Sequence, residues 1–311
     1  MKIRFFWKKM NKSFIYLTLF VFSILNANYP LIIEKQLTIS SQNGINSALA
    51  HLGQHTNPHE KPSITIWVHA TKFLSIVGDY LHATPRSGLI HISEFSWMYR
   101  LKSLLETLSK GDSLAYPIEH MYAYGWSGAL NFEDRKRESH NLYVAIKELT
   151  RVYQKKYNVI PHITLITHSH GGNVVLNMAH IKEKDSPIKV DAILMGCPVQ
   201  HATKHFVHDD LFEKVYSLYS MQDWIQAADP QGLYSHAANT DVHLEFSDRI
   251  FPFDKKLRQT HIKINGSGIW HLGYIRHYFL ALLPQLIKEI DQWETEIPHM
   301  AHQERILSVR V

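Results

Sequence analysis

Residues 163–173 read Ile-Thr-Leu-Ile-Thr-His-Ser-His-Gly-Gly-Asn, and this stretch decides the fold. An apolar, largely β-branched run over 163–166 ends abruptly at a turn that carries Ser169. A helical pattern follows at once, because apolar residues recur on one face at helix spacing: Val174, Val175, Met178 and Ile181. The segment therefore predicts a buried strand, a tight turn with one serine, and a helix.

This turn is the kind of place where a serine can act as a nucleophile. A tight strand–turn–helix connection lifts the hydroxyl of Ser169 above the edge of the sheet. The backbone N–H of His170 then lies at the helix N-terminus, where it can bind a developing oxyanion. The alternative is an ordinary strand-to-helix turn in which Ser169 only caps the helix.

Strands and helices alternate along the rest of the chain. We predict further strands over 63–68, 120–124, 190–195 and 214–219, a last strand from 242–246 with 261–264, and short opening strands at 31–33 and 37–39. Helices are expected over 97–108, 135–155 and 274–293, the last kinked or split by Pro284. This alternation predicts an α/β fold with a mostly parallel central sheet and helices on both faces. Ligands of such sheets bind outside the carboxyl ends of the strands.

The turn at Ser169 resembles the nucleophile elbow of α/β-hydrolases, particularly the lipase-like members, whose motif is G-x-S-x-G. Thr167 stands where the family has its first glycine, so we expect some strain or a slight shift at this Cβ-branched residue. The resemblance covers residues 62–290 and implies a Ser-Asp-His triad in that chain order. It also implies an acyl-enzyme mechanism on carboxylic esters of small molecules or lipids, without a cofactor.

Two residues fill the remaining triad positions that the resemblance implies. Asp223 follows the strand over 214–219, in a segment similar to the Ser-x-x-Asp-x-hydrophobic-Gln loop of lipase-like relatives. His271 follows the last strand, in a glycine-containing loop over 266–273 that can turn back toward Ser169. A solvated loop aspartate and a packing histidine are the alternatives. Three rival acids fit turns or caps better: Asp229, Asp241 and Asp248.

The oxyanion hole needs two N–H donors. The resemblance implies the N–H of His170 and one from the loop after the strand over 63–68, at Ala70 or Thr71. Relatives often have His-Gly in this loop, and Ala70 replaces a glycine whose backbone freedom alanine lacks. Two alternatives to an esterase follow from these departures and from the fold: an acyltransferase or thioesterase with the same triad, or a non-catalytic binding protein.

The organisation of the domain is also predicted from the sequence. We expect a hydrolase domain over 62–295 with a lid or cap insertion at 72–115, a lead-in over 28–61 and a tail over 296–311. Apolar lids suit acyl or lipid substrates, although core packing is the alternative for 72–115. Residues 199–213 are a second segment that could cover the pocket. Three histidines in it would share one face of a helix and could bind a metal: His201, His205 and His208. We expect a solvated or lid face there, and no metal site.

The N-terminus has the pattern of an export signal. A basic start precedes an apolar run over 14–25 and the small residue Ala27, so we expect residues 1–27 to be a signal peptide or an uncleaved anchor. The protein would then be secreted, periplasmic or membrane-associated. The chain has 33 Lys and Arg against 28 Asp and Glu, and five of the basic residues lie in 1–27. The remainder is balanced, so charge gives no reason to expect a nucleic-acid partner. One cysteine, Cys197, excludes an intramolecular disulfide.

Overall fold

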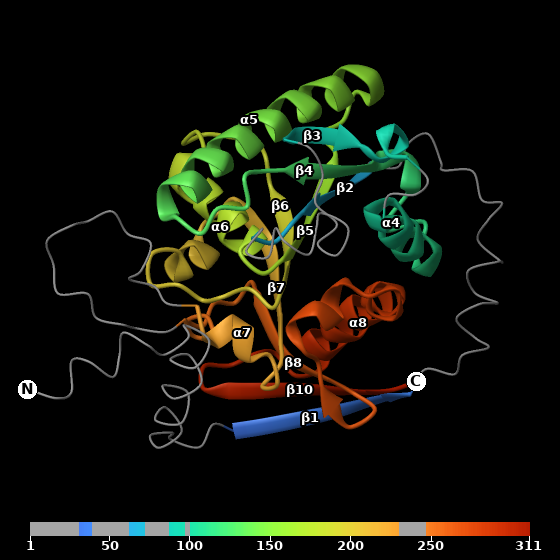
Figure 1. The fold of residues 1–311 in the computed structure, drawn as a ribbon, viewed down its shortest axis with the longest axis vertical. Coiled ribbons are helices and arrows are strands. Elements are labelled where there is room, and N and C mark those ends of the chain that lie inside the picture. Colours follow the sequence, from blue (N-terminus) through green and yellow to red (C-terminus); the bar gives the residue numbers. More distant parts are fainter. Residues whose placement is uncertain (1–30, 39–61, 72–86, 97–99, 230–246) are drawn as a thin grey trace, which may run out of the picture.

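The computed structural model describes residues 31–38, 62–71, 87–96, 100–229 and 247–311. These residues form one sheet with the strand order β1-β10-β8-β7-β6-β5-β2-β4-β3, and β9 pairs with β8 (Figure 1). The strands are β1 Leu31–Thr38, β2 Ser63–Val68, β3 Gly88–His91, β4 Met121–Gly125, β5 His162–His168, β6 Val190–Met195, β7 Phe212–Tyr219, β8 Leu257–Ile264, β9 Ser267–Gly268 and β10 Gln303–Arg310.

Among the described strands, the pairings are parallel except for β3 with β4 and β8 with β9. The helices are α4 Arg100–Gly111, α5 Phe132–Tyr157, α6 Gly171–Ile181, α7 Trp224–Ala227 and α8 His277–Glu296. The predicted α/β fold with a mostly parallel sheet is confirmed. Because the strands are parallel, the carboxyl ends of β2, β5, β6 and β7 meet at one edge of the sheet.

Helices cover both faces of this sheet. Helices α5 and α6 pack together over one face, and α4 and α8 pack together over the other (Figure 1). Successive strand residues point to opposite faces, so β2 sends Ile66 into the core beneath α5 and α6 and Trp67 into the core beneath α4 and α8. Both faces of the sheet are therefore buried beneath helices, as expected for mostly parallel strands with apolar sequences.

Several details differ from the sequence-based expectations. Residues 31–38 form one strand instead of two short ones, and β8 supplies the last predicted strand, while 242–246 lies outside the described residues. Helix α8 continues through Pro284 without a break. A Cβ on Gly111 of α4 would lie 3.0 Å from the Cγ of Pro284, so the glycine lets the two helices pack closely at the proline.

Two parts of the predicted domain organisation also need correction. Residues 303–310, expected in a tail, form β10 between β1 and β8. Part of the expected lid at 72–115 is core, because α4 packs against α8 and buries Leu101, Leu104, Leu105 and Leu108 completely. Residues 72–86 and 97–99 of that segment, and the expected leader over 1–27, lie outside the described residues. Within the described part of the chain, no helix has the length and apolarity needed to cross a membrane.

Candidate active site

Ser169 occupies the turn between β5 and α6 in a left-handed backbone conformation. Its φ is +53°, which an L-residue other than glycine adopts only at a cost in free energy. Strained residues of this kind cluster at functional sites. The backbone N–H of Ser169 donates to the carbonyl of Met195 at 2.9 Å, so the serine lies at the carboxyl ends of β5 and β6. The predicted strand–turn–helix therefore has a sharp turn at Ser169, which is buried, with 5% of its surface exposed.

Two glycines allow the helix to begin close to the sheet. A Cβ on Gly171 would lie 2.5 Å from the carbonyl oxygen of Val68 and 2.7 Å from that of His69. Only glycine therefore lets the start of α6 lie directly beside the end of β2. A Cβ on Gly172 would lie 2.5 Å from the Sγ of Cys197 and 3.3 Å from the Oγ1 of Thr167.

The second of these glycines explains how Thr167 is tolerated. Thr167 is completely buried, and its hydroxyl donates to the carbonyl of Ile193 at 3.3 Å. Space for the branched side chain comes from Gly172, which presents no Cβ toward it. The glycine missing at position 167 is therefore offset by a second glycine on the facing turn of α6.

Asp223 and His271 form a buried pair past the ends of β7 and β8. Nδ1 of His271 lies 2.8 Å from Oδ2 and 3.0 Å from Oδ1 of Asp223. A carboxylate only accepts hydrogen bonds, so Nδ1 of His271 carries a proton in this contact, and in the neutral tautomer of the ring the lone pair is on Nε2. Asp223 also accepts from the backbone N–H of Gln226, and its side chain is fully buried. This arrangement fixes both the tautomer and the orientation of the imidazole.

Contacts with neighbouring residues bring this pair to the elbow. The ring of His168, adjacent to Ser169 in the chain, lies 4.7 Å from the ring of His271, centroid to centroid. Nε2 of His168 also donates to the backbone carbonyl of His271 at 2.9 Å. Past the end of β6, a Cβ on Gly196 would lie 2.8 Å from the Oδ2 of Asp223. The three residues predicted for a triad therefore lie past the carboxyl ends of β5, β7 and β8, around one point of the sheet edge.

A second aspartate–histidine pair, which no local sequence pattern indicates, flanks Ser169. Nε2 of His170 lies 3.1 Å from Oδ1 of Asp229, and both side chains are almost fully buried. Asp229 also accepts from Gln200 at 2.7 Å and from Ser247 at 2.9 Å. Assigning Asp229 to turn chemistry was therefore wrong. The available signal was weak, because an Ala-Asp-Pro segment is also typical of turns.

Burial and hydrogen bonding set the charges in this pair. Burial lowers the pKa of His170, although the charge of Asp229 opposes that shift. Burial alone would raise the pKa of Asp229, but its contacts with His170, Gln200 and Ser247 outweigh burial and hold that pKa below its usual value. We therefore describe the pair near neutral pH as a neutral imidazole that donates Nε2–H to an ionised carboxylate.

The loop after β2 borders the start of α6. Trp126 donates its backbone N–H to Nε2 of His69 at 3.0 Å, so Nδ1 of His69 carries the proton and donates to the carbonyl of Ala70 at 2.5 Å. A trans peptide then turns the N–H of Thr71 away from the His69 ring. Ala70 does not have a positive φ, so the conformation observed here does not require the glycine of the relatives.

The other candidate residues lie apart from this site. Residues 204–208 form a 3-10 helix, so His201, His205 and His208 do not share an α-helical face, and His208 pairs with Asp254 at 2.8 Å. Asp248 contributes a backbone bridge to Val199, and Asp241 lies outside the described residues. Cys197 is buried, and burial raises the pKa of its thiol.

The solved structures that are similar to this chain include three hydrolases. No protein-family model matches the sequence, and no curated protein matches it. An α/β serine hydrolase without a lid from Xanthomonas campestris is 12% identical, covering 77% of this chain and 85% of that one, with a TM-score of 0.35. The esterase domain of a Rhodothermus marinus protein is 11% identical, covering 76% and 87%, also with a TM-score of 0.35.

The third solved structure is phospholipase PlaB from Legionella pneumophila in complex with thio-NAD. It is 16% identical, with a TM-score of 0.27, and the match covers 44% of this chain. The chain therefore spans only a quarter of the length of that phospholipase, 25%. At these identities the likeness is one of fold.

Proposed function

We propose that the protein is a serine hydrolase that cleaves carboxylic esters of small molecules or lipids. Ser169 is the nucleophile, His271 the general base and Asp223 the group that orients the base. The observation that carries this proposal is the 2.8 Å contact between His271 and Asp223 beside a serine held at a φ of +53°. A weakly nucleophilic hydroxyl needs a base in a fixed orientation, and the Nδ1–H contact supplies that orientation.

The reaction would proceed in two steps. Nε2 of His271 takes the proton of Ser169 as the serine oxygen attacks the acyl carbon, and the protonated imidazole then returns the proton to the departing alcohol. Water activated by the same nitrogen hydrolyses the acyl-enzyme and frees the serine. Asp223 stays ionised and stabilises the imidazolium in both steps.

The negative oxygen of the tetrahedral intermediate would be held by two backbone N–H groups. His170 offers one, because it caps the N-terminus of α6 and the helix leaves such groups without an internal partner. The second would come from the Ala70–Thr71 loop, and the bond from His69 to the Ala70 carbonyl favours the N–H of Thr71. Removing one such donor typically costs about 10²–10³-fold in kcat.

Fluorophosphonate labelling of the purified full-length chain tests the proposal. The activated oxygen of Ser169 would displace fluoride and form a bond to phosphorus, whereas an unactivated serine would not. We expect labelling of the parent and of Ser113→Ala, which alters an exposed serine, and none of Ser169→Ala. A parent that is folded by circular dichroism but unlabelled would favour the non-catalytic binding protein instead.

Ester turnover then separates hydrolysis from acyl transfer. A labelled enzyme that releases acid from p-nitrophenyl esters at a rate independent of added alcohol is a hydrolase. A rate that rises with the alcohol and yields a new ester indicates the acyltransferase alternative. A strong preference for thioesters over the matched oxygen esters indicates a thioesterase.

The proposal includes export from the cytoplasm, on the strength of the basic and apolar pattern over 1–27. Mass spectrometry of the mature N-terminus tests it. A start at residue 28 supports a cleaved signal, and a start at Met1 with retention in the membrane fraction supports an anchor. Cytoplasmic recovery of the intact chain contradicts both.

A further inference from the structure

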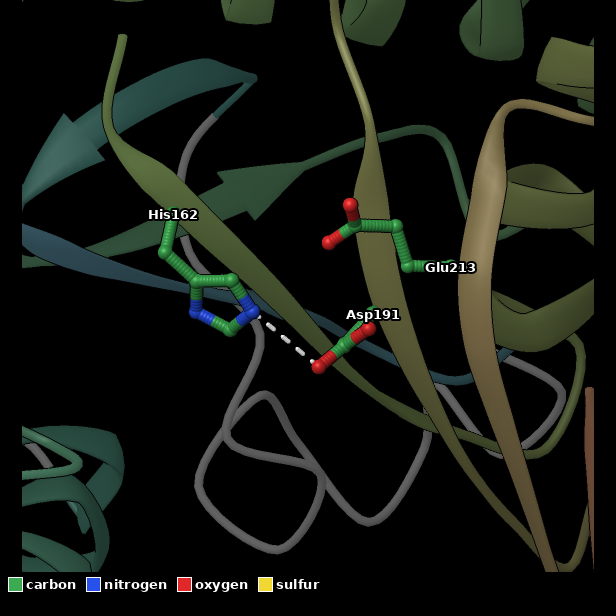
Figure 2. A group of neighbouring side chains, drawn as sticks. All are labelled: His162, Asp191 and Glu213. Atoms are coloured by element: carbon green, nitrogen blue, oxygen red, sulfur yellow. Dashed lines mark hydrogen bonds and ion pairs between the residues drawn. The ribbon is translucent and has the colours of Figure 1, made fainter. Parts of the chain in front are cut away.

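A group of three potential metal ligands lies at the amino ends of the strands, at the opposite edge of the sheet from Ser169. His162, Asp191 and Glu213 come from the amino ends of β5, β6 and β7, and their side chains face one another (Figure 2). Each residue offers one ligand atom, and these atoms all lie within 4.8 Å of one another. This is the one such group among the residues that the structure describes. It lies apart from the proposed triad, which follows the carboxyl ends of the strands.

The register of the sheet explains why the three side chains share one face. Thr164 pairs with Asp191, and His162 lies two positions before Thr164, so His162 and Asp191 point to the same side. Between β6 and β7 the register shifts, because Val190 pairs with Phe212 but Asp191 pairs with Lys214. Glu213 is the extra residue of this bulge.

A bulge re-aims the side chain of its extra residue, and bulges are frequent beside functional sites. In a regular strand, Glu213 would alternate with Lys214 and point to the other face of the sheet. Here its carboxylate instead reaches the group formed by His162 and Asp191 (Figure 2).

The central ligand of the group is buried and incompletely bonded. Asp191 is only 9% exposed, and its Oδ2 lies 3.1 Å from Nε2 of His162, the nitrogen that would bind an ion when Nδ1 carries the ring proton. Its Oδ1 is inaccessible and has no hydrogen-bond partner. A buried carboxylate oxygen without a partner is costly, so it calls for a positively charged neighbour. His162 is partly exposed and Glu213 is exposed, so an ion from solvent can reach the group.

We propose that His162, Asp191 and Glu213 bind a divalent transition-metal cation, of which Zn²⁺ is the best representative. Zn²⁺ accepts both imidazole nitrogen and carboxylate oxygen, whereas Ca²⁺ and Mg²⁺ take oxygen ligands almost exclusively. Zinc–ligand bonds of about 2.1 Å place neighbouring ligands of a tetrahedral ion about 3.4 Å apart. The 3.1 Å between Nε2 of His162 and Oδ2 of Asp191 is close to that spacing.

The remaining adjustment falls to Glu213, whose exposed side chain is free to move toward the ion, and water completes the coordination. A bound ion would link three adjacent strands whose far ends carry Ser169, Gly196 and Asp223. Because the unfolded chain lacks this arrangement of ligands, the ion would stabilise the fold. At one hundred times its dissociation constant, the folding equilibrium would shift about hundredfold toward the native state.

The test is a titration of the untagged full-length chain with Zn²⁺, in which calorimetry measures the heat of binding. The variants are Glu213→Gln and His162→Gln, both at accessible positions. The matched control is His208→Gln, which alters a histidine–aspartate pair of similar exposure, with Nδ1 of His208 2.8 Å from Asp254 and 40% and 15% of the two side chains exposed. Among the described residues, no third potential ligand lies close enough to His208 and Asp254 to form a group of three.

We expect one saturable site in the parent and in His208→Gln, and affinity at least tenfold weaker in each of the two ligand variants. Co²⁺ provides a direct signature, because its visible absorption on the parent would be lost in Glu213→Gln and His162→Gln. Circular dichroism establishes that each variant is folded. The absence of saturable binding by the folded parent would overturn the proposal, and so would unchanged affinity in both ligand variants.

Discussion

The carboxylate of Asp229 lies 3.1 Å from Nε2 of His170, the residue that follows Ser169 in the elbow. Asn173 holds the other side of the same ring, with its Nδ2 3.3 Å from Nδ1 of His170. Both ring nitrogens of His170 are therefore engaged within the protein. We infer that this buried pair fixes the backbone N–H that we propose as an oxyanion donor, without taking part in proton transfer.

Replacing Asp229 with asparagine should weaken both the fold and the reaction. The amide cannot accept from His170, Gln200 and Ser247 together as the carboxylate does, so about 2–3 kcal/mol of the free energy of unfolding should be lost. We expect kcat for an ester to fall about tenfold or more with little change in KM, because the oxyanion contact strengthens only in the transition state. Asp248→Asn, at a neighbouring exposed aspartate, serves as the control. If kcat of Asp229→Asn equals that of the parent, the pair of His170 and Asp229 has a purely structural role.

Loss of Asp223 or His271 should nearly abolish ester hydrolysis. Asp223→Asn removes the acceptor for Nδ1–H of His271 and allows the wrong tautomer, so kcat should fall about 10³–10⁴-fold, and His271→Ala should cost as much. The double variant should lose little more than either single one, because the residues act as a unit. Steady-state kinetics against the parent measure these losses. If kcat stays within tenfold of the parent in either single variant, the assigned base and acid are wrong.

The sequence predicts the central part of the fold well because strong local patterns specify it. The runs that become β2, β5 and β6 are mostly buried and apolar, as in any parallel sheet with helices on both faces. The second half of β7 is also buried, although Glu213 and Lys214 lie near its start. The abrupt end of one run at Ser169, followed by helical periodicity, predicts the elbow. The strands β3 and β10 were missed, because β3 is short and β10 mixes polar and apolar residues. β10 forms because it pairs with β1 on one side and β8 on the other, and a local sequence pattern does not reveal such partners.

The site is predictable only in part for a similar reason. Motifs and chain order indicate Ser169, Asp223 and His271, because each follows a strand end at a recognisable turn. Pairings across long stretches of chain leave no such local signal. His170 and Asp229 are 59 positions apart, and the group of His162, Asp191 and Glu213 depends on a bulge that periodicity does not reveal.

Gly171→Ala should be the more damaging of two glycine substitutions in the elbow. Its Cβ would meet two backbone carbonyl oxygens at 2.5 and 2.7 Å, and these can move only if β2 or α6 moves. We expect a loss of about 3 kcal/mol or more in the free energy of unfolding and a fall in fluorophosphonate reactivity, since the loop at Ala70 would shift. Urea denaturation and labelling rates measure the two effects. A fully stable and reactive variant would contradict the close contact between α6 and β2.

Gly172→Ala should be destabilising but open to rescue. Here the Cβ would meet the Sγ of Cys197 at 2.5 Å, so Cys197→Ala removes the nearest obstacle. We expect Gly172→Ala to cost about 1–3 kcal/mol and the double variant to recover a substantial part of that loss. A double-mutant cycle from urea denaturation gives the coupling. Strictly additive effects would mean that Thr167, and not Cys197, limits the space at this position.

The protein should lose stability as the pH falls from about 7.5 to 5.5. Burial lowers the pKa of four described histidines, His120, His170, His261 and His299. Below about pH 6.5 these groups take up protons in the unfolded chain while the folded protein resists protonation. The unfolded state therefore binds more protons, and the free energy of unfolding rises with pH.

Each such histidine adds at most about 1.4 kcal/mol per pH unit to this slope. Urea denaturation at pH 7.5, 6.5 and 5.5 measures it, and His299→Gln should lower the slope by up to one proton's contribution. His140→Gln, at an exposed helical position, provides the control. A free energy of unfolding that increases as the pH falls through this range would mean that the folded protein binds the extra protons, and that these histidines are accessible to protonation in the native state.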